Sequence, residues 1–245
     1  MPLIFLPEPE ISPGILTITG EKARYLATVL RCRPGDPLTI KDSRGNAFAS
    51  KIVDLGKKNV SVEITGREEA ERESPLQMVL AQGLLKGEKM DLVIQKTTEL
   101  GVQCIRPVVT GRSQVRTTRK TDRWKKIAEE ASRQSGRDRI PDVKEPVTLA
   151  EFLGESDMNG IILWEGGGQP LKEALSSAAG SAAGNKPTPF HILVGPEGGF
   201  SAAEVEEASK RGFVVCSFGK RTLRAETASI AAVSITQYVI GDMGL

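Results

Sequence analysis

The sequence predicts a two-part α/β protein, in which a small β-barrel precedes a larger domain built on a parallel sheet. Between residues 14 and 66, short segments alternate apolar and polar residues with a period of two, which is typical of half-buried strands. Beyond the polar stretch 66–75, apolar strand-like segments alternate with helix-like segments. This second rhythm favours a parallel sheet with helices on both faces. We therefore expect one domain over residues 1–72 and another over residues 73–245.

The N-terminal domain is expected to hold four strands and one helix. Turn-forming residues such as Asp42, Gly45 and Asn46 separate the alternating segments. Because each segment would bury one side only, the strands are predicted to form a small antiparallel barrel. The expected strands lie near residues 15–18, 37–41, 47–53 and 60–64, and the expected helix lies near residues 21–31.

The C-terminal domain is expected to alternate five strands with six helices. Thr148 with Glu151, and Ser201 with Glu204, have the spacing of a capping box, in which each side chain bonds the other residue's backbone at a helix start. The expected strands are 76–84, 105–110, 160–165, 190–194 and 213–218, and the expected helices are 88–100, 121–135, 148–153, 170–178, 201–211 and 226–240.

Several functional classes are disfavoured by composition. No segment approaches the roughly 18 consecutive apolar residues of a membrane span, and the N-terminus lacks the basic start of a secretory signal, so we expect a cytoplasmic protein with no membrane partner. Cys32, Cys104 and Cys216 lie far apart without metal-ligand spacing, which argues against a disulfide framework and against a bound metal. The single histidine, His191, lies inside an apolar run, so it is expected to be a core residue and not the base of a hydrolase.

Positive charge is concentrated in one stretch of the chain. Residues 106–139 contain eleven Lys and Arg against four acids, a net charge of +7, whereas the whole chain carries only +2. Such clustering favours a polyanionic partner, because nucleic-acid phosphates are bound mainly by Lys and Arg. A solvated helix face followed by a loop would carry the same charge, so both interpretations stay open.

Three expected strands end in glycine-containing turns, at residues 163–168, 193–201 and 217–228. Glycine lets a backbone approach a ligand closely, and open α/β sheets bind ligands beyond the carboxyl ends of their strands. None of the three is a Walker loop or a G-x-G-x-x-G fingerprint, and each alone could be a tight turn. Together they predict one shared pocket.

Two charged residues flank the expected start of the last helix. Glu226 suits the positive end of the helix dipole, whereas Arg224 does not. A substrate or partner could hold Arg224 there, and a local ion pair between the two residues is the alternative.

At these residues the sequence resembles the 16S rRNA (uracil-N3) methyltransferases of RsmE type, within the SPOUT superfamily. The resemblance spans most of the chain, and its two C-terminal motifs are specific when taken together. The motifs are residues 195–201 with Glu204, and residues 223–228; the supporting positions are Asp91, 95–96, 99–102, 130–131, 134–135, Arg137, 29–31 and 35–36.

This resemblance implies a fold and an activity. The fold would be an RNA-binding, PUA-like β-barrel over residues 1–72 and a SPOUT α/β domain with a deep trefoil knot over residues 73–245, assembled as a homodimer. The activity would be methylation of N3 of a specific uridine in 16S rRNA of the small ribosomal subunit, with S-adenosylmethionine (SAM) as methyl donor and no metal. A SPOUT ribose 2'-O methyltransferase and a non-catalytic RNA-binding assembly factor are the alternatives, and the intact glycine loops argue against the second.

The same resemblance and the charge distribution supply candidate site residues. Arg224 is expected to stabilise charge that develops on the uracil, while Glu197 or Glu226 orients the base, accepts its proton or braces a loop. The residues expected to bind SAM are Leu193, Val194, Gly195, Gly198, Gly199, Phe218, Gly219, Leu223, Arg224 and Ala228. The residues expected to bind RNA are Arg31, Arg112, Arg116, Arg119, Lys120 and Arg137.

Overall fold

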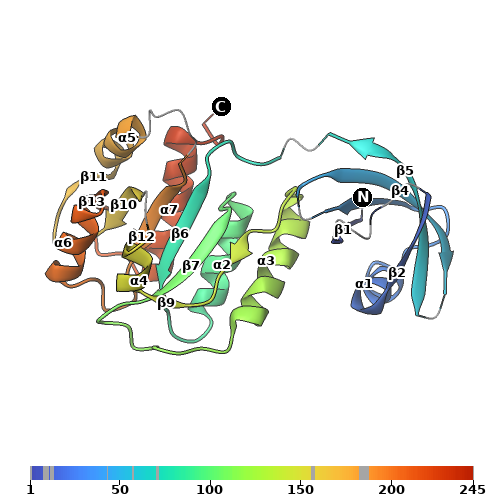
Figure 1. Cartoon of the computed structure of the whole chain (residues 1–245), viewed down its shortest axis with the longest axis horizontal. Coiled ribbons are helices and arrows are strands. Elements are labelled where there is room, and N and C mark those ends of the chain that lie inside the picture. The colour runs from blue at the N-terminus through green and yellow to red at the C-terminus, as the bar shows by residue number, and fades with distance from the viewer. Residues whose placement is uncertain are drawn as a thin grey trace. The chain divides into compact units, whose positions relative to one another are not determined.

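Two sheets, each with its own hydrophobic core, make up the computed structural model of the chain (Figure 1). The structure describes residues 2–7, 11, 14–42, 44–56, 58–69, 72–155, 158–181 and 188–244. The chain divides into two compact units: the first comprises Met1–Glu73 with Ser132–Ile140, and the second comprises Ser74–Ala131 with Pro141–Leu245. Within the described ranges, every helix is too short or too polar to cross a bilayer.

The first unit is built on a five-stranded sheet in the order β1-β3-β4-β5-β2. Its neighbours pair antiparallel except β1 and β3, which are parallel. Strand β1 was not expected from the sequence, and the expected helix divides into α1 and a π-helical turn, η2. The elements are β1 (Leu3–Phe5), β2 (Gly14–Thr19), α1 (Gly20–Arg24), η2 (Tyr25–Val29), β3 (Pro37–Lys41), β4 (Ala47–Leu55) and β5 (Asn59–Glu68).

A buried ion network joins the sheet of this unit to its late segment, Ser132–Ile140. The ammonium of Lys41, at the end of β3, lies 2.7 Å from a carboxylate oxygen of Asp138, and the two side chains are only 6% and 5% exposed. Lys41 also donates to the carbonyl oxygens of Gly136 and Arg137, at 2.9 and 2.8 Å. Both charges are therefore paired and hydrogen-bonded, as burial of ionic groups requires.

The second unit is built on an eight-stranded sheet in the order β11-β13-β10-β12-β6-β7-β8, with β9 also paired to β7, and all its strand pairs are parallel. The expected long elements are all present, whereas β8, β9 and β11 were not expected. The strands are β6 (Met78–Gly83), β7 (Cys104–Val109), β8 (Asp142–Val143), β9 (Val147–Thr148), β10 (Asn159–Leu163), β11 (Gln169–Pro170), β12 (Phe190–Val194) and β13 (Phe213–Ser217). The helices that follow or cover them are α2 (Lys89–Glu99), α3 (Thr121–Ser135), α4 (Leu149–Leu153), α5 (Leu171–Ser181), α6 (Ala202–Lys210) and α7 (Ala225–Ile240). The end of α3, from Ser132 on, belongs to the first unit.

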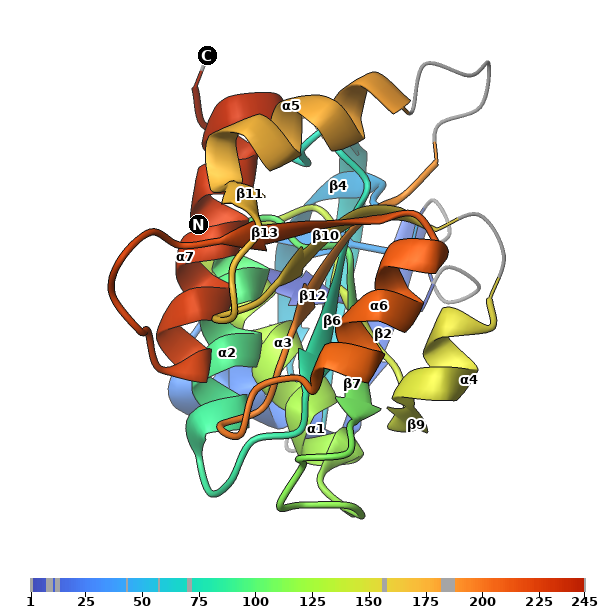
Figure 2. The same ribbon diagram turned by 90° about the vertical axis from the view of Figure 1, so that its left-hand side faces the viewer.

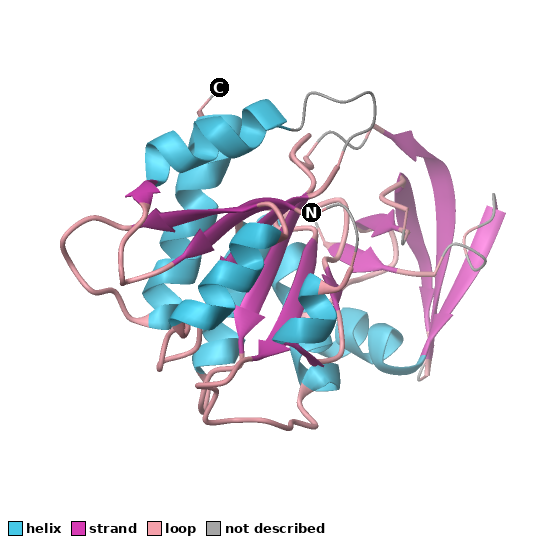
Figure 3. Ribbon diagram, turned by 60° about the vertical axis from the view of Figure 1, so that its left-hand side comes forward, coloured by secondary structure: helices cyan, strands magenta, loops and turns pink. Residues whose placement is uncertain are grey.

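Helices cover both faces of this sheet, which explains why its central strands are mostly apolar. Successive residues of one strand enter different cores: in β6, Leu80 joins the core formed with α2, α5 and α7, and Ala81 joins the core formed with α4 and α6. Figure 2 shows α2 and α7 on one side of the strands and α4 and α6 on the other, and Figure 3 shows the same layers by type of element.

Local signals read from the sequence are found where they were expected. Both capping boxes are formed, at Thr148 before α4 and at Ser201 before α6. His191 is buried; its Nδ1 donates to the carbonyl oxygen of Asn159 at 3.2 Å, and burial holds the pKa of the imidazole below its usual value. It is thus a satisfied core residue. Two of the three cysteines are buried, and Cys104 is only half-buried.

The buried pair of Lys41 and Asp138 predicts a large effect of removing one partner. Lys41→Met should lower the free energy of unfolding of the first unit by about 3 to 5 kcal/mol, because Asp138 would stay buried without its cation. Lys144→Met, which removes an exposed ion pair with Asp142, should cost no more than about 1 kcal/mol. Urea unfolding followed by circular dichroism measures the free energy of unfolding of both variants. Equal losses in the two variants would contradict a large contribution of the buried pair to stability.

Candidate active site

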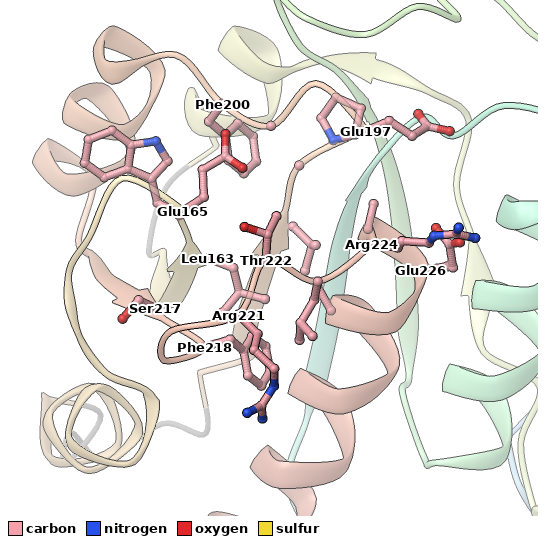
Figure 4. Close-up of a pocket in the computed structure, with 18 of the residues that line it drawn as sticks. Leu163, Glu165, Glu197, Phe200, Ser217, Phe218, Arg221, Thr222, Arg224 and Glu226 are labelled. Atoms are coloured by element: carbon pink, nitrogen blue, oxygen red, sulfur yellow. The ribbon is translucent and has the colours of Figure 1, made fainter.

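The carboxyl ends of three adjacent strands surround a pocket of about 440 Å³ in the second unit. Strands β13, β10 and β12 are neighbours in the sheet, so the three glycine-containing turns that follow them lie together. Figure 4 shows side chains from these turns and from the start of α7 around one space. The lining residues are Lys89, 163–165, 194–197, 199–200, 217–226 and Ala228. The convergence expected from the sequence is therefore confirmed.

Close backbone packing shapes the turn that follows β12. A side chain at Gly83, at the end of β6, would place its Cβ 2.4 Å from the backbone nitrogen of Pro196, so only glycine allows the turn to approach β6 this closely. Gly199 adopts a φ of +66°, a left-handed conformation that other residues rarely take. An added Cβ at Gly199 would meet the carboxylate of Glu165 at 3.1 Å.

A buried amide connects the same turn to α7. Gln82 is fully buried, and its Nε2 donates to the carbonyl oxygens of Gly83 and Gly195, at 3.0 and 3.3 Å. Its Oε1 accepts a hydrogen bond from the hydroxyl of Ser229, on the second turn of α7. One side chain thus holds the end of β6, the turn after β12 and the start of α7 together.

Glu197 is held in place by two donors at the edge of the pocket. Its Oε1 accepts from the ammonium of Lys89 at 2.9 Å and from the backbone N–H of Lys86 at 3.1 Å. Partial burial raises the pKa of this carboxyl, but these hydrogen bonds outweigh burial and leave the pKa below its usual value. Glu197 is therefore an ionised carboxylate that braces the turn against the segment before α2.

The start of α7 presents two charged side chains to the pocket. Arg224 precedes the helix with extended backbone, φ −63° and ψ 149°, and its side chain is exposed. Glu226 is partly buried, and its Oε2 is buried without a hydrogen-bond partner. Within the described part of the chain no ion pair joins the two residues, although both line the pocket (Figure 4). The local ion pair considered from the sequence is therefore not formed.

The expected RNA-binding residues fall into three places. Arg112, Arg116, Arg119 and Lys120 are exposed in the loop between β7 and α3 of the second unit, whereas Arg31 is exposed in the first unit, with a φ of +51°. Arg137 is instead 4% exposed, and its guanidinium pairs with Glu73 at 2.6 Å. Arg137 therefore forms a buried ion pair within the first unit, in contrast to the exposed cations.

Ten of the expected cofactor and catalytic positions line the pocket, and two do not. Leu193 lies in the hydrophobic core beneath the pocket, and Gly198 faces Arg112. The lining positions are Val194, Gly195, Glu197, Gly199, Phe218, Gly219, Leu223, Arg224, Glu226 and Ala228. Sequence reasoning placed Glu165 in the turn 163–168 but did not name it as a site residue. It missed Lys89, which carries no local pattern that marks a site.

The comparisons with known proteins cover both units. Residues 72–237 match the RNA methyltransferase domain family, and residues 18–65 match the RNA methyltransferase PUA domain family. The chain is 33% identical to ribosomal RNA small subunit methyltransferase E of Bacillus subtilis (strain 168) over 230 residues, which cover 91% of this chain and 89% of that protein. The chain belongs to the RNA methyltransferase family.

A solved structure extends the likeness from sequence to fold. Ribosomal RNA small subunit methyltransferase E of Neisseria gonorrhoeae, crystallised bound to S-adenosylmethionine, superposes with a TM-score of 0.87 at 32% identity and covers 99% of both chains. The relative from Buchnera aphidicola (subsp. Acyrthosiphon pisum, strain APS) is 31% identical over 92% of this chain and 88% of its own length. All three pocket turns lie inside the part of the chain that matches the RNA methyltransferase domain.

The hydrogen bonds of Gln82 predict that this residue stabilises the second unit. Gln82→Leu should lower the free energy of unfolding of the second unit by about 1 to 3 kcal/mol, because it removes a buried donor from Gly195 and an acceptor from Ser229. Gln103→Leu is the matched control. Gln103 is half-buried and its side-chain amide donates to the carbonyl oxygen of Ser74 at 3.3 Å, so a loss of about 1 kcal/mol or less is expected. Urea unfolding followed by tryptophan fluorescence reports on this unit, and a Gln82→Leu loss no larger than the control's would contradict the assignment.

Proposed function

We propose that the chain is an enzyme that transfers a methyl group from SAM to N3 of a specific uridine in 16S rRNA of the small ribosomal subunit. The observation that carries this proposal is the pocket formed by three glycine-containing turns at the carboxyl ends of β10, β12 and β13. It lies within a domain whose relatives are small-subunit rRNA methyltransferases, one of them bound to SAM. Because the substrate would be ribosomal, we expect the protein to act in the cytoplasm.

The residues of the pocket fit SAM. Its volume of about 440 Å³ suits a ligand of nucleoside size, and Leu163, Phe218 and Leu223 give it apolar walls. The turns leave space where side chains would intrude: a Cβ at Gly195 would lie 3.2 Å from the backbone of Gly199. SAM supplies an electrophilic methyl group. We propose that Val194, Gly195, Gly199, Phe218, Gly219, Leu223, Arg224 and Ala228 hold the cofactor, and that Leu193 and Gly198 support the turn from behind.

The protein's main contribution would be to align donor and acceptor. Correct positioning of two reactants can supply about 7 to 11 kcal/mol of a reaction barrier. A methyl group reaches N3 of uracil only as that nitrogen loses its proton, so negative charge develops on the base. Arg224 lines the pocket at the start of α7, and we assign to it the stabilisation of that charge.

Between the two candidate carboxylates, we favour Glu226 as the group that orients the base or accepts its proton. Its Oε2 is buried without a partner, so it can accept a hydrogen bond from a ligand without breaking one. Glu197 already accepts from Lys89 and Lys86, and its lowered pKa makes it a weaker proton acceptor. We therefore assign Glu197 to bracing the turn.

We further propose that exposed cations guide the RNA to this pocket. Arg112, Arg116, Arg119 and Lys120 belong to a loop of the second unit, and Arg31 would bind RNA from the PUA-like domain proposed for residues 1–72. Arg137 is not included, because it is buried and paired with Glu73.

The family resemblance also supports a homodimer, a PUA-like β-barrel over residues 1–72 and a knot. Helices α2 and α7 pack together and carry exposed apolar residues, among them Leu92 at 40% and Tyr238 at 68% exposure, which a second copy would cover. From the same resemblance we propose a deep trefoil knot in the domain over residues 73–245.

The function is tested by incubating the protein with labelled SAM and unmethylated small subunits, followed by mapping of the labelled nucleoside. Label at N3 of a single uridine is expected. Label on a ribose 2'-oxygen would instead identify the protein as a ribose 2'-O methyltransferase. If the protein neither binds SAM nor transfers label, a non-catalytic RNA-binding assembly factor is favoured. Gly199→Val serves as the negative control, because its side chain would enter the space beside Glu165 and should abolish SAM binding. Valine is also strained at a φ of +66°, so circular dichroism is used to check that the variant stays folded.

Loss of the loop cations and loss of Arg224 should affect RNA binding and turnover in opposite ways. Replacing Arg116, Arg119 and Lys120 with Ala should weaken RNA binding and lower its logarithmic salt slope by roughly 0.7 to 0.9 for each phosphate that is no longer bound, with SAM affinity unchanged. Arg224→Ala should keep most of the RNA affinity but lose turnover, because its charge acts in the transition state. RNA binding across salt concentrations and single-turnover methylation measure both; a wild-type salt slope in the triple variant would exclude this loop from the RNA path.

A further inference from the structure

Glu204 makes one hydrogen bond more than its capping role requires. It lies in the first turn of α6, where its Oε2 accepts from the backbone N–H and the hydroxyl of Ser201, at 2.8 and 2.9 Å. These bonds complete the capping box that follows the glycine turn. Its second oxygen, Oε1, accepts from the backbone N–H of Gly111 at 2.7 Å, across 93 residues of sequence. Glu204 therefore joins two loops.

The loop that Glu204 reaches carries the exposed cations, residues 110–120. Arg112 lies directly against the glycine turn: its guanidinium donates to the carbonyl oxygen of Gly198 at 3.2 Å, and a Cβ added at Gly198 would meet Arg112 at 3.0 Å. Arg116 donates to the carbonyl oxygen of Gly111 at 3.2 Å. Gly111 is thus held by Glu204 through its N–H while its carbonyl oxygen holds a cation.

The charge state of Glu204 suits this role. Partial burial raises the pKa of its carboxyl, but the hydrogen bonds from Gly111 and Ser201 outweigh burial and leave that pKa below its usual value. The side chain is therefore ionised near neutral pH, and hydrogen bonds to a carboxylate are stronger than those between neutral groups. The matching capping residue of α4, Glu151, uses its Oε2 for both bonds to Thr148.

We propose that Glu204 is a positioning residue that fixes the loop 110–120 against the glycine turn, so that Arg112 and Arg116 stand ready beside the methyl-donor pocket to bind RNA phosphates. The inference rests on the proposed function, because it assigns those cations to RNA. Fixing the loop before RNA arrives removes part of the ordering cost of binding. RNA affinity would then depend on a carboxylate that itself touches no RNA.

Glu204→Gln tests the proposal, since one amide oxygen cannot accept from both Gly111 and Ser201. We expect the Kd for a labelled 16S rRNA fragment to rise about ten-fold, the amount that loss of a charged hydrogen bond would give if it were felt fully in binding. We also expect the logarithmic salt slope of RNA binding to fall by roughly 0.7 to 0.9 for each phosphate that the loop no longer binds. The SAM affinity, measured by calorimetry, and the single-turnover rate at saturating RNA should stay within about two-fold of wild type, since the pocket itself is unchanged.

Two matched variants separate positioning from capping. Glu151→Gln makes the same chemical change in the capping box of α4, and Ser201→Ala weakens the α6 cap while leaving the hydrogen bond to Gly111. Both should keep the wild-type salt slope. Gly111→Pro removes the same hydrogen bond from the donor side and should reproduce the fall, which keeps the test open if Glu204→Gln folds poorly.

The outcomes distinguish this inference from the function on which it rests. If the wild-type protein methylates its uridine but Glu204→Gln and Gly111→Pro keep the wild-type RNA Kd and salt slope, the positioning role is overturned alone. If Glu204→Gln lowers SAM affinity as much as RNA affinity, the residue supports the pocket and not the RNA loop, which also overturns the proposal. Failure of the wild-type protein to methylate would count against the function itself.

Discussion

The hydrogen bonds of Gln82 are the constraint on which the pocket depends. The strands that carry the glycine turns are fixed by the sheet, but the turns extend beyond it and need their own anchor. Gln82 provides one by donating to Gly195 and accepting from Ser229, both at buried positions. Next to it, the absence of a side chain at Gly83 lets Pro196 lie against β6. A polar residue in the core is acceptable here because both ends of its amide are satisfied.

Much of the second unit could be predicted from sequence because its signals are local. The helix expected at 121–135 is α3, Thr121–Ser135, and the capping boxes at Thr148 and Ser201 are formed as their spacing indicates. Strands β8, β9 and β11 have two residues each, too few for any periodicity, and they exist because a neighbouring strand offers free hydrogen-bonding groups. Strand β1 pairs with β3 across more than thirty residues, and its three residues give no local signal either.

The parts of the site that are marked by glycine-rich turns could be predicted from the sequence. Roles that depend on a partner far away in the sequence were missed. Glycine-rich turns after apolar strands led to the pocket. A count of cations could not separate Arg116, which is exposed, from Arg137, which is buried against Glu73, because the sequence does not show which carboxylate a cation will meet. Lys89 was missed for the same reason, since its role at the pocket edge comes from Glu197, 108 residues away. Glu204 was recognised as a cap and as part of a family motif, but its hydrogen bond with Gly111 was not foreseen because the two residues are equally remote in sequence.

The membership of Ser132–Ile140 in the first unit has a consequence for the order in which the chain matures on the ribosome. All five strands of that unit are synthesised by Glu68, yet the carboxylate that neutralises Lys41 belongs to Asp138. At ordinary rates of translation, the roughly 65 residues between Glu73 and Asp138 take about 3 to 13 s to make. During that interval Lys41 has no anion from this segment, so the nascent sheet must keep its ammonium hydrated. The first unit, although it is the first to be synthesised, is therefore completed only after β6, α2 and β7 of the second unit have also been made. Synthesis of the two units thus overlaps in time.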